Sequence, residues 1–235
     1  MTDFEKKIEA LQADMKSIYW GQIYNSTIAG SQWLLDTAVS PGRWAVGYEY
    51  LYVLYRALTE SRPTSILELG LGQSTKLTAQ YAGYQGISHL IIEHDPQWAE
   101  YFLAGWPGLS ENSVVQLLPL EQRGTATSPY FAYQQFCEIT KRPGGWSLIS
   151  IDGPFGGKGD ISRRDVLEQL PHIIADDFVI MMDDCGRLGE ANTIKEMLLV
   201  LQNTGIPCEF GVYDGGGNKK TCIIVSEKWK WLTTL

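Results

Sequence analysis

The stretch Ser65-Ile66-Leu67-Glu68-Leu69-Gly70-Leu71-Gly72-Gln73-Ser74-Thr75 decides the fold class of this chain. Its first five residues form a short apolar run typical of a buried strand, and two glycines then turn the chain into a helix predicted from Thr75 to Tyr84. The next apolar run, His89 to Glu93, ends on an acid that follows Gly72 by 21 residues. At this spacing a carboxylate accepts hydrogen bonds from the ribose hydroxyls of a ligand bound on the glycine turn. The stretch therefore predicts a site for an adenosine-type ligand.

More apolar runs continue the pattern toward the C-terminus. Predicted strands lie at Ser113 to Leu118, Trp146 to Ile151 and Phe178 to Met182, with predicted helices at Pro96 to Trp106 and Ser162 to Ile174. Such strands alternating with helices favour a parallel sheet covered on both faces. Near the end, Glu209 to Tyr213 and Thr221 to Val225 flank a glycine-rich loop and predict a hairpin. The predicted fold class is α/β, a doubly wound, mainly parallel seven-stranded sheet with an antiparallel C-terminal hairpin strand.

The first 62 residues have a different pattern. Five apolar residues follow a helical spacing over residues 3–20, namely Phe4, Ile8, Leu11, Met15 and Ile18. Residues 25–44 predict a loop with one short helix, and Tyr48 to Thr59 predicts another helix. Nine Trp and Tyr residues crowd between Tyr19 and Tyr55. We expect residues 1–62 to form a helical extension or lid packed on a core of residues 63–235, with homodimer pairing of the first helix as the alternative to packing.

Composition narrows the classes of partner. The chain of 235 residues has 19 Lys and Arg against 27 Asp and Glu, a net charge of −8, and no basic cluster, which disfavours bulk nucleic-acid binding. The four cysteines show no C-x-x-C spacing. No signal-peptide pattern and no run of about 18 apolar residues occurs, so we expect a cytoplasmic protein without a membrane span.

In their order along the chain, these motifs resemble the class I S-adenosylmethionine-dependent methyltransferases. Ile66 to Gly72 is similar to the first motif of that superfamily, Ile91 to Pro96 to the ribose-binding second strand, Trp146 to Pro154 to the fourth-strand motif and Phe178 to Asp184 to the fifth. The final hairpin is similar to the reversed last strand of that fold. The resemblance covers about residues 63–226. It implies a Rossmann-like fold and S-adenosylmethionine as cofactor.

The resemblance also implies a role for particular residues. It places the methionine part of the cofactor on the first motif, the ribose on Glu93, the adenine beside His94 and the reaction centre at Asp152. The cofactor-binding residues of the first motif are then Glu68, Gly70, Gly72, Ser74 and Thr75. Two alternatives stay open: Glu68 serves only to order the loop, or His94 only caps the helix that begins near Pro96.

Carboxylates at neighbouring strand ends are the candidates for chemistry. Asp152, Asp183 and Asp184 are hard oxygen ligands suited to Mg²⁺ or Ca²⁺. In the simpler interpretation, Asp183 and Asp184 cap turns and Asp152 orders the bend at Gly153-Pro154. Catechol-type O-methyltransferases look similar here, because an aspartate after strand four and an Asp-Asn pair after strand five hold their divalent metal. This chain departs from them by having Asp184 for the Asn and Phe155 where their catalytic lysine falls.

The loop after strand four supplies the remaining candidates. We expect Asp152 and Lys158 to be catalytic, with Lys158 substituting for the missing lysine from its glycine-flanked loop. Ser162 and Asp165 have the spacing of a helix cap, and Arg163 or Arg164 is the alternative recognition site for an anionic acceptor.

The predicted function is methyl transfer to an oxygen of a small molecule or saccharide. Two alternatives belong to other classes. An NAD-dependent oxidoreductase would use Glu93 equally well, but the third glycine of its fingerprint is missing and the terminal hairpin argues against it. A non-catalytic methyltransferase-like module that binds adenosine ligands is compatible with the same motifs, because a fold does not fix a function.

Overall fold

A seven-stranded sheet forms the centre of the computed structural model, which describes residues 2–42, 44–156, 159–217 and 219–234. The strands are β1 (Ser65–Leu69), β2 (Ser88–Glu93), β3 (Ser113–Leu117), β6 (Trp146–Ile151), β7 (Ile174–Met182), β8 (Cys208–Gly216) and β9 (Lys219–Ser226). Their order in the sheet is β3-β2-β1-β6-β7-β9-β8. The first five pair in parallel, and β9 runs antiparallel to both β7 and β8. The predicted fold class is confirmed.

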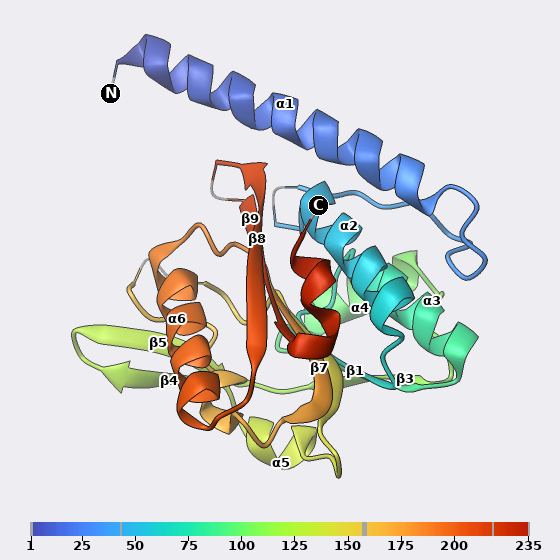
Figure 1. Ribbon diagram of the computed structural model, residues 1–235, viewed down its shortest axis with the longest axis vertical. Coiled ribbons are helices and arrows are strands. Elements are labelled where there is room, and N and C mark those ends of the chain that lie inside the picture. Colours follow the sequence, from blue (N-terminus) through green and yellow to red (C-terminus); the bar gives the residue numbers. More distant parts are fainter. Residues whose placement is uncertain (1, 43, 157–158, 218, 235) are drawn as a thin grey trace.

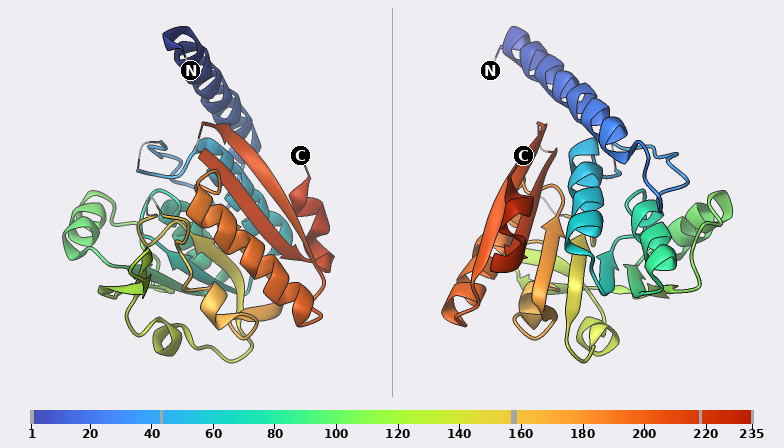
Figure 2. Two further views of the ribbon diagram at one scale, coloured as in Figure 1. Left: turned by 90° about the vertical axis from the view of Figure 1, so that its left-hand side faces the viewer. Right: turned by 45° about the vertical axis from the view of Figure 1, so that its right-hand side comes forward.

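Helices cover both faces of this sheet (Figure 2). On one face lie α2 (Tyr48–Arg56), α3 (Thr75–Gln85) and α4 (Pro96–Gly105), and on the other lie α5 (Phe136–Thr140), α6 (Leu188–Asn203) and a hairpin of β4 (Leu120–Thr125) and β5 (Ser128–Tyr133). Alternate residues of β1 serve the two faces, since Ile66 packs with α2 and α3 whereas Leu67 packs with α6. Single-turn or irregular helices are η1 (Ala57–Ser61), η2 (Leu167–Gln169) and η3 (Glu227–Thr233).

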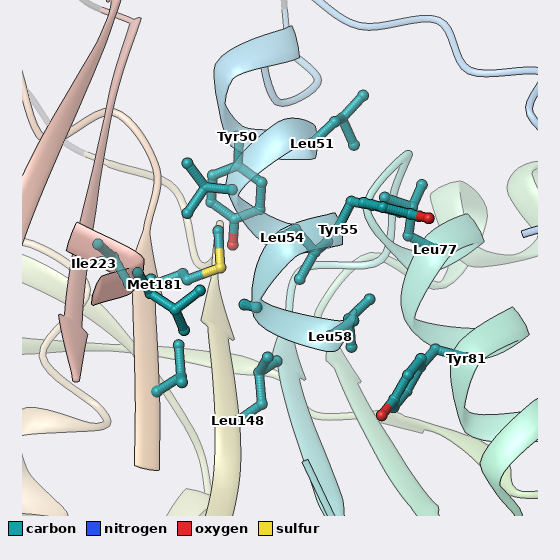
Figure 3. Packing of buried hydrophobic residues seen from close by; sticks show 14 of the residues in the cluster. Tyr50, Leu51, Leu54, Tyr55, Leu58, Leu77, Tyr81, Leu148, Met181 and Ile223 are labelled. Carbon is teal, nitrogen blue, oxygen red and sulfur yellow. The ribbon is translucent and has the colours of Figure 1, made fainter. Parts of the chain in front are cut away.

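The N-terminal segment contributes directly to the main core. Tyr50, Leu54 and Leu58 are fully buried against Leu148 of β6 and Met181 of β7 (Figure 3). Most of the crowded aromatic residues are buried in the same cluster, namely Trp20, Tyr24, Trp33, Tyr50 and Tyr55. Helical packing on the sheet therefore accounts for them, while a boundary at residue 62 and a lid function stay predictions.

Helix α1 (Asp3–Ile28) lies across the end of the molecule and extends past the sheet layers (Figures 1 and 2). Trp20 donates a hydrogen bond from Nε1 to the Asp214 carbonyl at 2.9 Å, and Lys16 pairs with the Asp214 carboxylate at 2.5 Å. These contacts fix its C-terminal half to the tip of the β8–β9 hairpin.

None of the helices in the described parts of the chain combines the length and apolar character that a membrane crossing requires.

Two predicted helices are wrong. The segment Ser162 to Ile174 forms turns and η2, and β7 already begins at Ile174. Arg163 adopts a positive φ of 50°, and Pro171 disfavours helical geometry in the residue before it, so a continuous helix is broken at both ends. No short helix occurs between Ala29 and Gly47 in the described residues, because α1 continues to Ile28.

The hairpin β4–β5 was not predicted, since its strands lack clear apolar alternation.

Candidate functional site

The glycine turn between β1 and α3 is shaped by two glycines with different constraints. Gly70 has a φ of 98°, and a Cβ there would lie 3.1 Å from the Asp152 carbonyl carbon and 3.2 Å from the Gly153 nitrogen. A side chain is therefore excluded where the turn passes the end of β6. A Cβ at Gly72 would meet no described atom within 4 Å. The surface beside Gly72 is thus open to a ligand.

Glu68 lies inside the protein rather than at this open surface. Its carboxylate accepts hydrogen bonds from Ser74 Oγ at 2.5 Å and Thr78 Oγ1 at 2.7 Å, and His89 Nε2 lies at 3.1 Å. Thr75 Oγ1 in turn accepts from the Gly72 N–H at 3.0 Å. These contacts favour the alternative in which Glu68 orders the loop, and the side chains of Ser74 and Thr75 also bond within the protein.

Glu93 connects the end of β2 to the glycine turn. Its buried carboxylate accepts hydrogen bonds from the backbone N–H groups of Leu71 at 3.0 Å, His94 at 2.6 Å and Asp95 at 2.9 Å. Burial raises the pKa of Glu93, but hydrogen bonds from the His94 side chain and from these N–H groups outweigh it, so the pKa is lowered overall. Glu93 is therefore held as an anion beside Gly72.

Two buried polar atoms close to Glu93 lack partners in the protein. His94 Nδ1 lies 2.9 Å from the Glu93 carboxylate, whereas its Nε2 and the Tyr133 hydroxyl are buried without a hydrogen-bond partner among the described residues. The ring of Phe155 meets that of His94 edge-on at 4.4 Å. The helix-capping alternative for His94 is wrong, because the Asp95 carboxylate caps α4. A nucleoside bound here would find free polar groups.

The three predicted aspartates do come together at neighbouring strand ends. Asp152 follows β6, while Asp183 and Asp184 follow β7, and one carboxylate oxygen of each lies within 4.8 Å of the others. Lys219 at the start of β9 lies among them, with Nζ 3.2 Å from a carboxylate oxygen of both Asp183 and Asp184. From the other side, the buried guanidinium of Arg163 lies 3.1 Å from Asp152 and 3.5 Å from Asp184.

The charge of this cluster is partly balanced within the protein. Arg187 pairs with Asp184 at 2.9 Å and lies 3.6 Å from the buried Glu190, so three cationic side chains face the three aspartates and Glu190. Burial lowers the pKa of Lys219, but Asp183 and Asp184 raise it further, and the net shift is upward. A divalent cation binds carboxylates that are free to ligate it. The cluster therefore does not fit Mg²⁺ while Lys219 is in place.

Asp152 is the most accessible member of the cluster, with 19% of its side chain exposed against 0% for Asp183 and 5% for Asp184. Burial and the neighbouring Asp183 carboxylate raise the pKa of Asp152 to about 8, although Arg163 opposes the shift. A carboxyl group with this pKa holds a proton below about pH 8 and accepts one in its ionised form above that pH. The other catalytic candidate, Lys158, lies outside the described residues.

Sequence reasoning missed Lys219 and misinterpreted Arg163. Lys219 lies far along the chain from the aspartates, and only its position at the start of a strand that pairs with β7 brings it to them. Arg163 is internal, and Arg164 is held by Glu196 at 2.6 Å, so neither favours recognition of an anionic acceptor. The predicted cap is also wrong, because Ser162 Oγ has no partner in the described part of the chain.

Asp165 makes the stability of the fold depend on pH. Burial raises its pKa to about 7, although the Tyr133 N–H donates to it at 2.8 Å. An unfolded aspartate has a pKa near 3.9, so the native state holds the proton more tightly, and stability falls as pH rises from about 4 to 7 by at most about 4 kcal/mol. We expect Asp165→Asn to remove this contribution, so that its melting temperature falls less between pH 5 and pH 8 than that of the wild type.

Thermal denaturation at the two pH values measures this difference. The exposed Asp176 provides a matched control, because Asp176→Asn should retain the wild-type pH dependence. An unchanged pH dependence in Asp165→Asn would show that Asp165 is not the group responsible.

Comparison with known proteins is informative only at the level of structure. No family model matches the sequence, and no curated protein does. The SAH-bound methyltransferase PaMTH1 of Podospora anserina is 11% identical, with 97% of each chain covered and a TM-score of 0.51. A candidate O-methyltransferase from Klebsiella pneumoniae is 16% identical, with 89% of this chain and 98% of that chain covered and a TM-score of 0.51. The chain therefore shares the Rossmann-like fold of class I methyltransferases.

Proposed function

We propose that this chain is an S-adenosylmethionine-dependent methyltransferase that acts on a hydroxyl group of a small molecule, a class that includes saccharides. The observation that carries the proposal is the Glu93 carboxylate, held as an anion at the end of β2 beside the open side of Gly72. The unpartnered His94 Nε2 and Tyr133 hydroxyl support it, since both offer hydrogen bonds to a nucleoside.

The residues around the turn divide into those that would hold the cofactor and those that shape the turn. Glu93 would hold the ribose, His94 the adenine, and the backbone from Gly70 to Gly72 the methionine part. Glu68, Ser74 and Thr75 keep the turn in the required shape through their buried hydrogen bonds. When bound, S-adenosylmethionine supplies a sulfonium methyl group that is transferred to an oxygen nucleophile.

Asp152 is the group proposed to assist the reaction. It is the most exposed carboxylate of the cluster, and above about pH 8, where it is ionised, it can take the proton of the acceptor hydroxyl. Arg163 fixes its carboxylate at 3.1 Å, which limits its freedom to turn away from an acceptor. Positioned proton acceptors of this type contribute about 10²- to 10⁴-fold in rate.

The proposal is tested by screening for an acceptor that is methylated and then replacing Asp152, the proposed proton acceptor. Purified protein, S-adenosylmethionine and a panel of phenols, catechols and saccharides are assayed for release of S-adenosylhomocysteine. We expect one acceptor class to react, and Asp152→Asn to lower the rate with that acceptor at least a hundredfold while S-adenosylhomocysteine binds with unchanged affinity. The exposed Asp176→Asn serves as control.

Three outcomes would argue against this proposal. Binding of S-adenosylhomocysteine without turnover of any acceptor would favour the non-catalytic module. Binding of NAD⁺ in its place would favour the oxidoreductase. Full activity of Asp152→Asn would remove Asp152 as the proton acceptor.

A further inference from the structure

The Lys219 ammonium group lies among oxygen atoms from two parts of the chain. Its Nζ lies 3.2 Å from Asp183 Oδ2 and 3.2 Å from Asp184 Oδ1, and it donates to the Ala45 carbonyl at 3.1 Å. The ammonium group donates hydrogen bonds to the Ala45 carbonyl and to Asp183 Oδ2, and Asp184 Oδ1 lies within ion-pair distance. Lys219 thus lies among oxygen atoms as a bound cation would.

The buried position of Asp183 makes the loss of the Lys219 ammonium group unfavourable. Asp183 is fully buried and its second oxygen, Oδ1, has no hydrogen-bond partner in the described structure. Removing the ammonium would leave the buried Asp183 carboxylate without its ion-pair partner, which is strongly unfavourable, whereas Asp184 would keep Arg187 at 2.9 Å. Asp183 therefore requires a cation at this position, and the chain supplies its own.

We propose that Lys219 occupies the position of a divalent cation in the acid cluster and that the chain works without a metal. The part of this inference that concerns catalysis rests on the proposed function. Lys219 then acts as a positioning residue: together with Arg163 it holds the carboxylates so that Asp152 faces the acceptor. The binding of cations by the cluster does not depend on any activity.

Mn²⁺ is the probe for this proposal, because its electron paramagnetic resonance signal reports binding directly. We expect no binding to the wild type below about 1 mM. Lys219→Met, which keeps the length of the side chain but not its charge, should bind Mn²⁺ at least tenfold more tightly, and Lys219→Arg should not. Lys220→Met is the matched control, since Lys220 lies outside the cluster, and it should behave as the wild type.

Further measurements make each outcome decisive. With an acceptor found by the screen, chelator should leave wild-type turnover unchanged. Tight Mn²⁺ binding by the wild type that Asp183→Asn abolishes would overturn the proposal, even if Lys219→Met does not fold. A folded Lys219→Met that binds Mn²⁺ no better than the wild type would also overturn it. Failure to bind S-adenosylhomocysteine would contradict the proposed function and leave the Mn²⁺ result interpretable.

A separate observation concerns the outer face of α1. Its apolar residues Phe4, Leu11, Met15 and Ile18 are each more than 60% exposed, and Ile8 is 39% exposed. The C-terminal part of the helix, which carries Trp20 and Tyr24, is buried against the body of the protein. Large apolar side chains aligned along one exposed helix face mark an interaction surface.

We infer that a second copy of this chain covers this face through antiparallel pairing of the two α1 helices. The alternating spacing of four and three residues is the seam used by two packed helices. With Ile8 of one copy opposite Leu11 of the other, Lys7 of each copy lies opposite Asp14 of the other. The antiparallel pairing therefore places two Lys7–Asp14 pairs of opposite charge on the same side of the seam.

Sedimentation equilibrium tests this pairing. We expect a dimer at micromolar concentration, and a shift to monomer for the double variant Leu11→Glu/Met15→Glu. Lys7→Glu should weaken the dimer, and Lys7→Glu/Asp14→Lys should restore it. A wild type that is monomeric at 100 μM, or a dimer that none of these substitutions affects, would contradict the inference.

Discussion

Glu93→Ala is expected to weaken the binding of S-adenosylhomocysteine at least a hundredfold. The substitution removes the carboxylate proposed to hold the ribose, and it also leaves the Leu71 and Asp95 N–H groups without their acceptor. A hydrogen bond to a charged group is worth about 1.5 to 3 kcal/mol, so loss of two ribose contacts alone exceeds a hundredfold. Isothermal titration calorimetry measures the change.

Two further variants separate loss of ligand contacts from loss of structure. Glu93→Gln keeps the size of the side chain and one acceptor oxygen, so it should remain folded and still lose at least tenfold in affinity. Glu100→Ala, at an exposed position of α4, should bind as the wild type. A folded Glu93→Ala protein with wild-type affinity would show that Glu93 only ties the glycine turn to β2.

Gly70→Ala is expected to lower the stability of the fold, whereas Gly72→Ala is expected to weaken ligand binding. At Gly70 the added methyl group meets the Asp152–Gly153 backbone at 3.1 Å and the backbone has a φ of 98°, so the free energy of unfolding should fall by about 2 kcal/mol or more. At Gly72 the methyl group meets no described atom within 4 Å, so stability should be unchanged. The same methyl group would project into the proposed cofactor site and should weaken binding at least tenfold.

Urea denaturation and calorimetry of the pair provide the measurement. Each variant serves as the control for the other, because the two differ by one methyl group at neighbouring glycines of one turn. Equal destabilisation of both would contradict the geometry of the turn. A Gly72→Ala variant with wild-type affinity would place the cofactor elsewhere.

The parallel part of the fold could be predicted because its signals are local. The strand beginning at Ser65, the glycine turn and the acid at Glu93 were predicted from one continuous stretch, and β1 and β2 were found there. The meeting of Asp152 with Asp183 and Asp184 followed from the rule that parallel strands end at one edge of the sheet.

What could not be predicted depends on contacts between distant segments. Lys219 reaches the aspartates only because β9 runs antiparallel to β7, and its role depends on burial that one-dimensional spacing does not report. Arg163 was a candidate for recognising an anionic acceptor, but it is buried and pairs with Asp152 and Asp184. Glu68 matches the first motif, yet its carboxylate is hydrogen-bonded to the Thr78 and His89 side chains inside the protein. In each case a buried charge finds partners that the local sequence does not contain.

Titration of the wild-type protein with S-adenosylhomocysteine and with NAD⁺, each followed by calorimetry, tests the central claim most directly. We predict binding of S-adenosylhomocysteine at one site per chain with a dissociation constant in the micromolar range, and no heat with NAD⁺. The result that would contradict the proposed function is binding of NAD⁺ with no binding of S-adenosylhomocysteine.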